Sequence, residues 1–374
     1  MTTIQNTTAM ICRKIFGLTL ICMTAVTPLI SQQQYSKRVV KSFKVNNSTT
    51  VDIFNKYGKV HIVTWEKDSV SFNIDLRIKA SSDSKLNKLK NNIDFDFTGT
   101  AYYVIAKTRI GRNTNSVFND LADIAGSILS SENKVTIDYL VMMPKHINLK
   151  LENKFGDIYI DDYDGNINVT LSNGELKAND LHGNSVIRVS SGDGIVNAIK
   201  DGKLSVSYSD FHVRNADKLS VESRSSRISI DQASFLKLIS RRDKLYLPDV
   251  SELYGESYWS DFTIHHLRNE LNMNLNSGNL SIDAVQKGFS FIQIISEYTD
   301  FDLVFERGSA YVIDITHHED AILSYPRQLS NLQTKVISKE DKQKLTYGKI
   351  GSASSGSKVK ISASKKCTIN IAHR

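Results

Sequence analysis

The sequence has little of what marks metal-dependent, nucleophilic or disulfide-stabilised proteins. Its 374 residues include three cysteines, four prolines and two tryptophans. No G-x-S-x-G, H-E-x-x-H or C-x-x-C pattern occurs, and there is no phosphate-binding loop. These absences exclude the common signatures of serine hydrolases, zinc proteases, thiol redox proteins and nucleotide-binding proteins. We therefore predict no catalytic residues, no metal site and no cofactor.

The first 34 residues are predicted to be a secretory signal peptide. Arg13 and Lys14 precede an apolar run over 15–30, and a polar stretch of serine and glutamine follows. Sixteen residues that include Pro28 are short for a membrane-spanning helix. We expect export through the Sec pathway to the periplasm or outer surface of a Gram-negative cell, with no transmembrane domain after cleavage. A retained signal anchor is the alternative, and the chain could start at Met1 or at Met10.

Loss of this leader changes the cysteine count and the charge. Cys12 and Cys22 leave with it, so Cys367 has no partner for an internal disulfide. The formal net charge of +7 falls to +5 when Arg13 and Lys14 are removed. This excess is spread along the chain without a nucleic-acid-binding motif, so we expect no nucleic-acid partner.

A short phrase recurs between Asn153 and Phe305. A turn pair of small or polar residues precedes two apolar residues at positions i and i+2, as Phe155-Gly156 precedes Ile158 and Ile160. The second residues of successive pairs are 16 to 22 positions apart, with a mean of 18. The nine pairs are Phe155-Gly156, Asn173-Gly174, Asp193-Gly194, Ser209-Asp210, Ser225-Ser226, Asp243-Lys244, Ser260-Asp261, Ser277-Gly278 and Thr299-Asp300.

This period predicts an all-β fold built from repeats. Residues two apart lie on one face of a strand, and so few apolar residues form a core only when copies stack. We predict a β-solenoid with about 18 residues per coil, two short strands per coil and a small helical insertion. The alternative is an antiparallel sandwich with regular hairpins.

The chain divides into four predicted regions. Residues 1–34 form the signal peptide, 35–147 an N-terminal β region, 148–306 the solenoid, and 307–374 a C-terminal insertion with closing strands. An amphipathic helix is expected at about 115–130, to cap an open end or cover a flank, and a shorter one at Ser84–Asn92. Gln328–Lys344 is expected to be a loop. The apolar pairs at 359/361 and 369/371 are expected to form the last coil.

Two stretches carry a resemblance to a known family. Asn55–Ile62 reads NKYGKVHI, continuing to Asp68, and Asn153–Ile160 reads NKFGDIYI. They resemble a family of exported bacterial proteins regarded as adhesins, with a DUF4097-type β-strand repeat, frequent in Bacteroidetes. The resemblance implies a β-solenoid at the cell envelope and carries no catalytic residues. The chain departs from the pattern after Asn173, where Asp, Ser or Lys replaces several turn glycines.

One set of side chains stands out from the polar turns. Large planar groups come just before the turn pairs, and in stacked coils they would form a strip able to stack on sugar rings or pair with acids. The candidate ligand-binding residues are Tyr208, Arg224, Arg242, Tyr258, Trp259 and Tyr298. The alternative is a self-stabilising cation–π ladder without a ligand. The alignment drifts by one residue between coils, which would substitute Ser207, Arg241 and Tyr258.

Other polar clusters give weaker signals. Asp157, Asp161, Asp162 and Asp164 lack the spacing of an EF-hand and are expected in turns. The adjacent pairs His265-His266 and His317-His318 would point to opposite faces of a strand, so neither pair supplies two ligands to one metal.

These observations favour an exported cell-envelope protein with an adhesin-like, non-catalytic binding or scaffolding role. Its partner would be a cell-surface glycan or an envelope protein. The alternative is a carbohydrate-active β-helix enzyme, a polysaccharide lyase or hydrolase. The basic residues from Arg224 to Lys244 have no carboxylate pair in obvious register with them, which weighs against that alternative.

Overall fold

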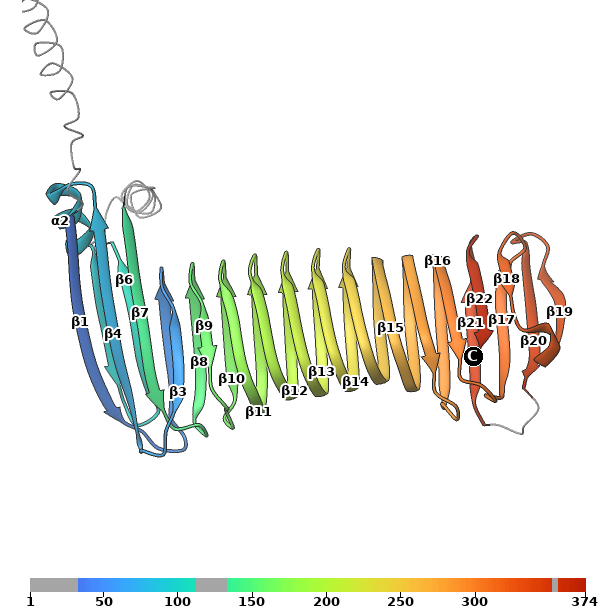
Figure 1. Cartoon of the computed structure of the whole chain (residues 1–374), viewed down its shortest axis with the longest axis horizontal. Helices are drawn as coiled ribbons and strands as arrows, with labels where there is room; N and C mark the ends of the chain where they lie inside the picture. The colour runs from blue at the N-terminus through green and yellow to red at the C-terminus, as the bar shows by residue number, and fades with distance from the viewer. Residues whose placement is uncertain (1–32, 112–132, 352–355) are drawn as a thin grey trace, which may run out of the picture.

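The protein is an elongated stack of β-strands (Figure 1). The computed structural model describes residues 33–111, 133–351 and 356–374. Within these residues, hydrogen bonds join 22 strands into one sheet, and the only α-helix is a short one. The prediction of an all-β class with a small helix is confirmed. The signal peptide, apart from Gln33 and Gln34 at the start of the first strand, and the helix expected at about 115–130 fall outside the described residues.

The middle of the stack is built from strands that pair in parallel. Asp193 lies beside Asp210, Asp210 beside Arg227, and Arg227 beside Lys244, so neighbouring coils are offset by 17 residues. The strands here are β10 (Ile167–Ser172), β11 (Glu175–Ser190), β12 (Asp193–Ser207), β13 (Asp210–Arg224), β14 (Arg227–Arg241), β15 (Lys244–Val285) and β16 (Phe291–Phe305). With 15 or 16 residues, β11 to β14 and β16 each supply about one coil, whereas β15, with 42 residues, supplies more than two and β10, with 6, only part of one.

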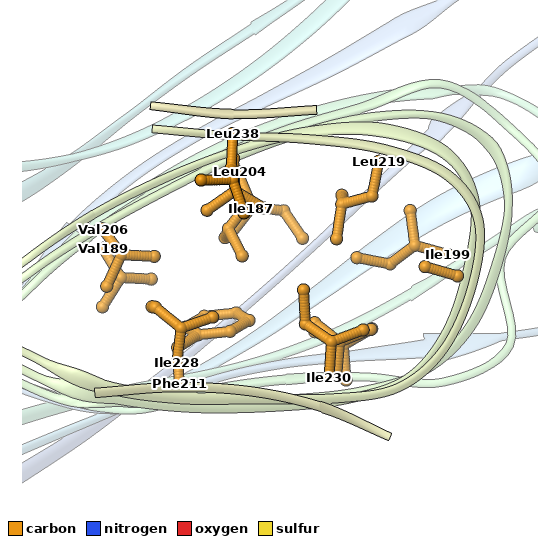
Figure 2. Close-up of a cluster of buried hydrophobic side chains, with 14 of the residues drawn as sticks. Ile187, Val189, Ile199, Leu204, Val206, Phe211, Leu219, Ile228, Ile230 and Leu238 are labelled. Atoms are coloured by element: carbon orange, nitrogen blue, oxygen red, sulfur yellow. The ribbon is translucent and has the colours of Figure 1, made fainter. Parts of the chain in front are cut away.

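The core lies inside the coils. Figure 2 shows the ribbon passing around the apolar side chains as a flattened loop, with Leu204 and Leu238 pointing inward from one side and Phe211 and Ile228 from the other. All four are at most 2% exposed. Since alternate residues of each strand point inward, a coil buries two opposite rows and leaves two polar faces outside.

A turn with a left-handed residue closes one corner of each coil. These residues, which we call the αL row, have φ between +51° and +63°. The row comprises Tyr57, Phe155, Asn173, Ser191, Tyr208, Ser225, Arg242, Trp259, Ser277 and Tyr298. The residue after each one turns inward, and where it is glycine the coils are in close contact. A Cβ on Gly174 would lie 2.2 Å from the carbonyl oxygen of Gly156 in the neighbouring coil.

The structure moves several turns by one or two positions from those expected. In place of Asp193-Gly194, the turn is at Ser191-Gly192, and Gly194 lies within β12. A Cβ on Gly194 would be 2.2 Å from the ring of Phe211, so this glycine makes room for a core side chain. The turns expected at 209–210, 243–244, 260–261 and 299–300 each begin one residue earlier.

The N-terminal part adds a coil and closes that end of the stack. Its strands are β1 (Gln33–Lys44), β2 (Thr50–Lys56), β3 (Val60–Thr64), β4 (Ser69–Ala80), β5 (Ile93–Gly99), β6 (Tyr103–Ile110), β7 (Lys134–Met143), β8 (Asn148–Lys154) and β9 (Ile158–Ile160). The coil of β2 and β3 stacks on that of β8 and β9, with Asn55 beside Asn153 and Val60 beside Ile158. The two copies of the repeated phrase thus lie in register although they are 98 residues apart.

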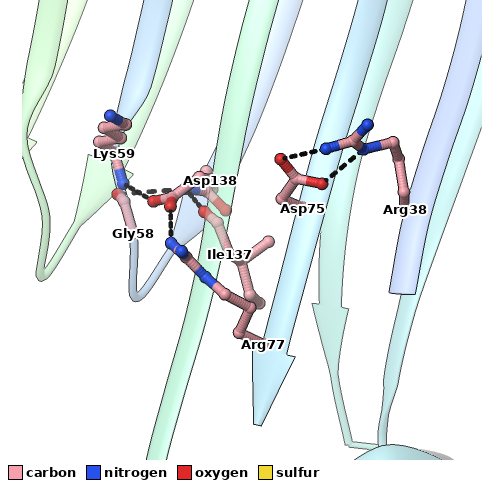
Figure 3. A network of polar contacts seen from close by, with 8 residues as sticks. Arg38, Gly58, Lys59, Asp75, Arg77, Ile137 and Asp138 are labelled. Carbon is pink, nitrogen blue, oxygen red and sulfur yellow. Dashed lines mark hydrogen bonds and ion pairs between the residues drawn. The ribbon is translucent and has the colours of Figure 1, made fainter. Parts of the chain in front are cut away.

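Antiparallel strands and the helix cover this end. β1 pairs with β4, β4 with β7, and β5 with β6. Helix α2 (Asp83–Asn91) contacts β4, β1 and β5, and its N-cap Ser82 accepts a hydrogen bond from the Lys85 amide, so the helix expected at Ser84–Asn92 is confirmed. Polar contacts cross these strands (Figure 3): Arg38 pairs with Asp75, and Asp138 accepts from Arg77 and from the Lys59 amide.

The C-terminal strands are inserted out of chain order. They are β17 (Tyr311–His318), β18 (Ile322–Ser324), β19 (Ser330–Ser338), β20 (Gln343–Ile350), β21 (Lys358–Ala363) and β22 (Thr368–His373). β21 lies between β16 and β17, and β22 between β16 and β18. The final strand pair therefore forms the coil before the last, which corrects its expected place at the end.

The prediction of a loop over Gln328–Lys344 is also wrong. After a short 3₁₀ turn at Arg327–Leu329, β19 and β20 form an antiparallel hairpin on β17. β19 is mostly exposed, so its side chains carry no core pattern. Backbone hydrogen bonds to β20 hold it, and polarity alone could not reveal them.

Candidate functional site

The six candidate residues lie at the turn corner, in two adjacent rows. Tyr208, Arg242, Trp259 and Tyr298 belong to the αL row. The three aromatic members are 58–60% exposed, which is high for side chains of this size. Arg224 and Tyr258 belong to the row just before it, which we call the pre-turn row; Ser207, Arg224, Arg241 and Tyr258 are consecutive partners there.

Four planar groups from two neighbouring coils meet at this corner. The Arg242 guanidinium carbon lies 5.6 Å from the ring centre of Trp259, and that of Arg241 lies 5.8 Å from Tyr258. The Tyr258 and Trp259 ring centres are 6.4 Å apart. Two parallel cation–π pairs therefore form, one in each row. Tyr208 and Tyr298 are separated from them in the αL row by Ser225 and Ser277.

A buried polar ladder supports the corner from inside. At four of the five positions where the inward turn residue is not glycine, its side-chain oxygen accepts a hydrogen bond from the corresponding amide of the preceding coil; at the fifth, Thr299 donates to the Glu297 carbonyl instead. The bonds run from the Gly192 amide to Ser209 at 3.1 Å, from Ser209 to Ser226 at 3.3 Å, from Ser226 to Asp243 at 2.8 Å and from Asp243 to Ser260 at 3.1 Å. Serine and aspartate in place of the turn glycine therefore form a hydrogen-bonded ladder of side chains, which sequence reasoning did not find.

Asp243 is the best-bound member of this ladder. Its carboxylate is 2% exposed and accepts hydrogen bonds from the hydroxyls of Ser223 and Ser240, both at 2.7 Å, and from the Arg241 amide at 2.8 Å. Together with the Ser226 amide, four donors converge on it. The turn carrying Arg241 and Arg242 is therefore held in place by buried hydrogen bonds.

The corner is strongly basic. Arg224 and Arg227 come from one coil, and Arg241, Arg242 and Lys244 from the next, so the structure brings together five cations that the sequence spreads over 21 positions. Among the described residues, Arg227 is the one member of this set in an ion pair, with Asp210. The other four cations remain available to an acidic ligand.

A cleft of about 600 Å³ opens at this corner. Tyr208, Ser225 and Arg242 of the αL row line it, with Arg227 and Lys244 beside them. Because Ser225 lies between two large side chains, it forms a low point in the row. We call this the Ser225 notch.

A second groove, of about 730 Å³, lies on the neighbouring outer face and shares Arg227 and Lys244 with the cleft. Tyr246 lines it, and its hydroxyl is 2.7 Å from Nε2 of His265, whose Nδ1 is 2.6 Å from Asp283. When Nδ1 carries the proton and donates to Asp283, Nε2 accepts from the Tyr246 hydroxyl. The chain of bonds orients the phenol in the groove. Sequence reasoning missed it, although spacings of 19 and 18 residues place its members one coil apart.

Several of the other polar candidates contact neighbouring side chains. Asp164 accepts from Lys145 at 3.1 Å and contacts His182 at 3.0 Å; the hydrogen bond from Lys145 is the main reason that the pKa of Asp164 is lowered. His317 is buried, with Nε2 3.0 Å from the Thr346 hydroxyl. His318 contacts Asp320 instead.

Neither a metal site nor a membrane span is found in the part of the chain that the structure describes. No group of three or more histidine, cysteine or acidic side chains there is arranged to hold a metal ion. The helices of the same part include none that is long and apolar enough to cross a membrane.

Comparison with known proteins gives only distant likeness. No family model and no curated protein matches the chain. Among solved structures, a "putative cell adhesion protein" of Clostridium sporogenes is 11% identical and has a TM-score of 0.20; the match covers 91% of this chain and 100% of that one. A "putative adhesin" of Bacteroides fragilis is 9% identical with a TM-score of 0.26, covering 90% and 97% of the two chains. A "putative lipid binding protein" of Parabacteroides distasonis is 11% identical with a TM-score of 0.27, covering 89% and 96%. Likeness at this level assigns neither family nor function, so the DUF4097 resemblance stays a prediction.

Proposed function

We propose that the protein is an exported β-solenoid of the cell envelope that binds a surface glycan or an envelope protein without catalysing a reaction. The observation that carries this proposal is the exposed corner, where Arg242 and Trp259 stack across two coils beside Arg241 and Tyr258. Tyrosine, tryptophan and arginine dominate binding hot spots because they offer large, rigid contact areas at low entropic cost.

The support beneath the corner favours binding over a purely structural role. Asp243 and its hydrogen-bonded neighbours already fix the turns from inside. Tyr208, Trp259 and Tyr298 remain largely exposed, so much of their surface is left for a partner. A preorganised surface binds more tightly because less ordering is required on association.

The domain limits belong to the same proposal. The signal peptide would occupy 1–34, the N-terminal β region 35–147, the solenoid 148–306 and the C-terminal closing segment 307–374. Export predicts that sequencing the N-terminus of the mature protein finds a new start near residue 35. An intact Met1 or Met10 on the purified protein would refute cleavage.

The binding role is tested by removing the stacked pair. Arg242→Ala with Trp259→Ala should weaken binding to a panel of immobilised neutral and acidic polysaccharides about tenfold or more, and leave the β circular-dichroism signal intact. The matched control is Lys237→Ala with Tyr254→Ala, a cation and an aromatic group in register on the other face. Unchanged binding with a lower thermal midpoint would show that the stacked pair is structural.

A catalytic role is the second candidate, because Tyr246, His265 and Asp283 form a hydrogen-bonded chain beside a groove. A lyase or hydrolase would release unsaturated products or reducing ends from one of the same polysaccharides. Turnover that His265→Ala abolishes would overturn the non-catalytic proposal.

A further inference from the structure

We propose that the Ser225 notch binds one ring of an acidic oligosaccharide, stacked between Tyr208 and Arg242 with its carboxylate on the basic residues of the corner. The inference rests on the proposed binding function and names the ligand class and its seat. It follows from the spacing of the coils, the side chains of the αL row and the charge around Ser225.

The spacing of the coils sets the width of the notch. Residues of the αL row in successive coils are ~4.8 Å apart, so Tyr208 and Arg242, two coils apart, leave ~9.6 Å between them. A ring seated over Ser225 would lie ~4.8 Å from each neighbour, a distance at which rings stack. The same row shows such contacts elsewhere: Tyr57 and Phe155 stack at 5.4 Å with 10° between their planes. The notch is thus the width of one missing ring.

The two walls differ in chemistry. Tyr208 is 58% exposed and presents an aromatic face, which suits the C–H face of a pyranose. Arg242 is exposed and is backed by Trp259 at 5.6 Å. A guanidinium supported in this way keeps its planar orientation and can donate to a carboxylate as well as stack on a ring.

The charge around the notch selects an acidic ring. Arg224 immediately precedes Ser225, and Arg241 and Lys244 come from the next coil. Two acids also line the cleft: Asp210 is already paired with Arg227, and Asp193 accepts a hydrogen bond from the Asp210 amide. A carboxylate on the sugar would therefore meet cations without displacing an existing ion pair.

A second gap in the row offers a contrast. Ser277 lies between Trp259 and Tyr298, but its surroundings include Asp261, Asn279 and Glu297 in place of arginine. The Ser277 gap thus lacks the charge that an acidic sugar requires. This difference makes it the natural control position.

The test fills the notch without removing a contact. Ser225→Tyr places a ring in the gap, and the backbone tolerates it because Tyr208, Trp259 and Tyr298 have the same left-handed conformation. The probe is oligogalacturonate, compared with a neutral oligogalactose of the same length. Ser225→Tyr should weaken oligogalacturonate binding at least tenfold, whereas Ser277→Tyr should leave it unchanged, and the neutral probe should bind more weakly to the native protein.

Further variants and outcomes make the test decisive. If Ser225→Tyr lowers the β circular-dichroism signal, Arg224→Gln with Arg242→Gln takes its place and should reduce oligogalacturonate binding and remove its preference over the neutral probe. Equal oligogalacturonate binding by the native protein and Ser225→Tyr would show that the notch is not the binding site, and the proposed function would still stand. Binding to other polysaccharides but not to oligogalacturonate would overturn the acidic-sugar assignment. So would a loss of binding to anionic phospholipid vesicles in Ser225→Tyr as large as its loss of oligogalacturonate binding. No binding to any polysaccharide would overturn the glycan-binding form of the proposed function, and this inference with it.

Discussion

The side chain of Asn153 joins the first repeat coil to the rest of the stack, and removing it should open that junction. Asn153 is fully buried, and its amide nitrogen lies 2.9 Å from the Gly58 carbonyl, 2.9 Å from that of Gly156 and 3.2 Å from that of Asp157. Gly58 belongs to a coil 95 residues earlier in the chain. The side chain therefore holds together two coils that the sequence separates.

The cost of Asn153→Ala can be worked from these bonds. The amide has two N–H groups, so it satisfies two of the three carbonyls at a time. Losing two hydrogen bonds, with buried acceptors left behind, costs about 2–4 kcal/mol. If local opening follows, exchange of the neighbouring turn amides should accelerate roughly 30- to 700-fold, since about 1.4 kcal/mol corresponds to a factor of ten.

Hydrogen exchange followed by mass spectrometry measures this locally, which matters because a long stack of coils does not guarantee two-state unfolding. The control is Asn215→Ala, which deletes the same group from an exposed position and should change stability by less than about 0.5 kcal/mol. If turn amides near Gly58 and Gly156 exchange equally in both variants, the assigned role of Asn153 is wrong.

Three other outcomes follow from buried groups. Gly174→Ala should lower the thermal midpoint, because its Cβ would meet the Gly156 carbonyl oxygen at 2.2 Å, whereas Gly356→Ala, with open space around it, should not. Burial raises the pKa of the Cys367 thiol to about 11, so a thiol reagent at pH 8 should react slowly until denaturant is added; fast reaction of the native protein would contradict this. Burial also raises the pKa of Tyr163 above its ordinary value of about 10, so the neutral form stabilises the fold below that pH and this contribution is lost as pH rises further. The thermal midpoint of Tyr163→Phe should therefore fall less steeply between pH 10 and 12 than that of the native protein, and parallel curves would refute the reasoning.

Much of the repeat could be read from the sequence because one physical rule generates it. Apolar residues at i and i+2 after each turn point into the coil, as Phe211 and Val213 do, and their recurrence sets the period. The phase of the turns was less certain. Once serine or aspartate replaces glycine, the inward turn residue and the first exposed strand residue are both small or polar. The apolar pattern that follows is then the same whether the turn pair is Asp243-Lys244, as expected, or Arg242-Asp243, as the structure has it.

The placement of the two terminal coils could not be read in this way. β2 pairs with β8, and β21 inserts between β16 and β17, but any coil edge offers the same backbone donors and acceptors. Only the three-dimensional arrangement decides which edge is filled. Sequence reasoning missed the hydrogen-bonded chain Tyr246–His265–Asp283 for a related reason. These residues can be predicted to be neighbours only if the length of the coils that contain them is known.

Closure of the ends supports the proposal that the corner is the interaction surface. β1, the outermost strand of one end, carries Lys37, Arg38 and Lys41, all exposed, and β19 at the other end contains an irregular register between Val336 and Ser338. Charges and bulges on edge strands oppose the addition of another strand. The coils from β8 to β16 are consecutive in the chain, so their side chains recur at ~4.8 Å along the corner. A partner with a regular repeat can therefore be matched along the side of the stack, where Arg242 and Trp259 lie, and not at its ends.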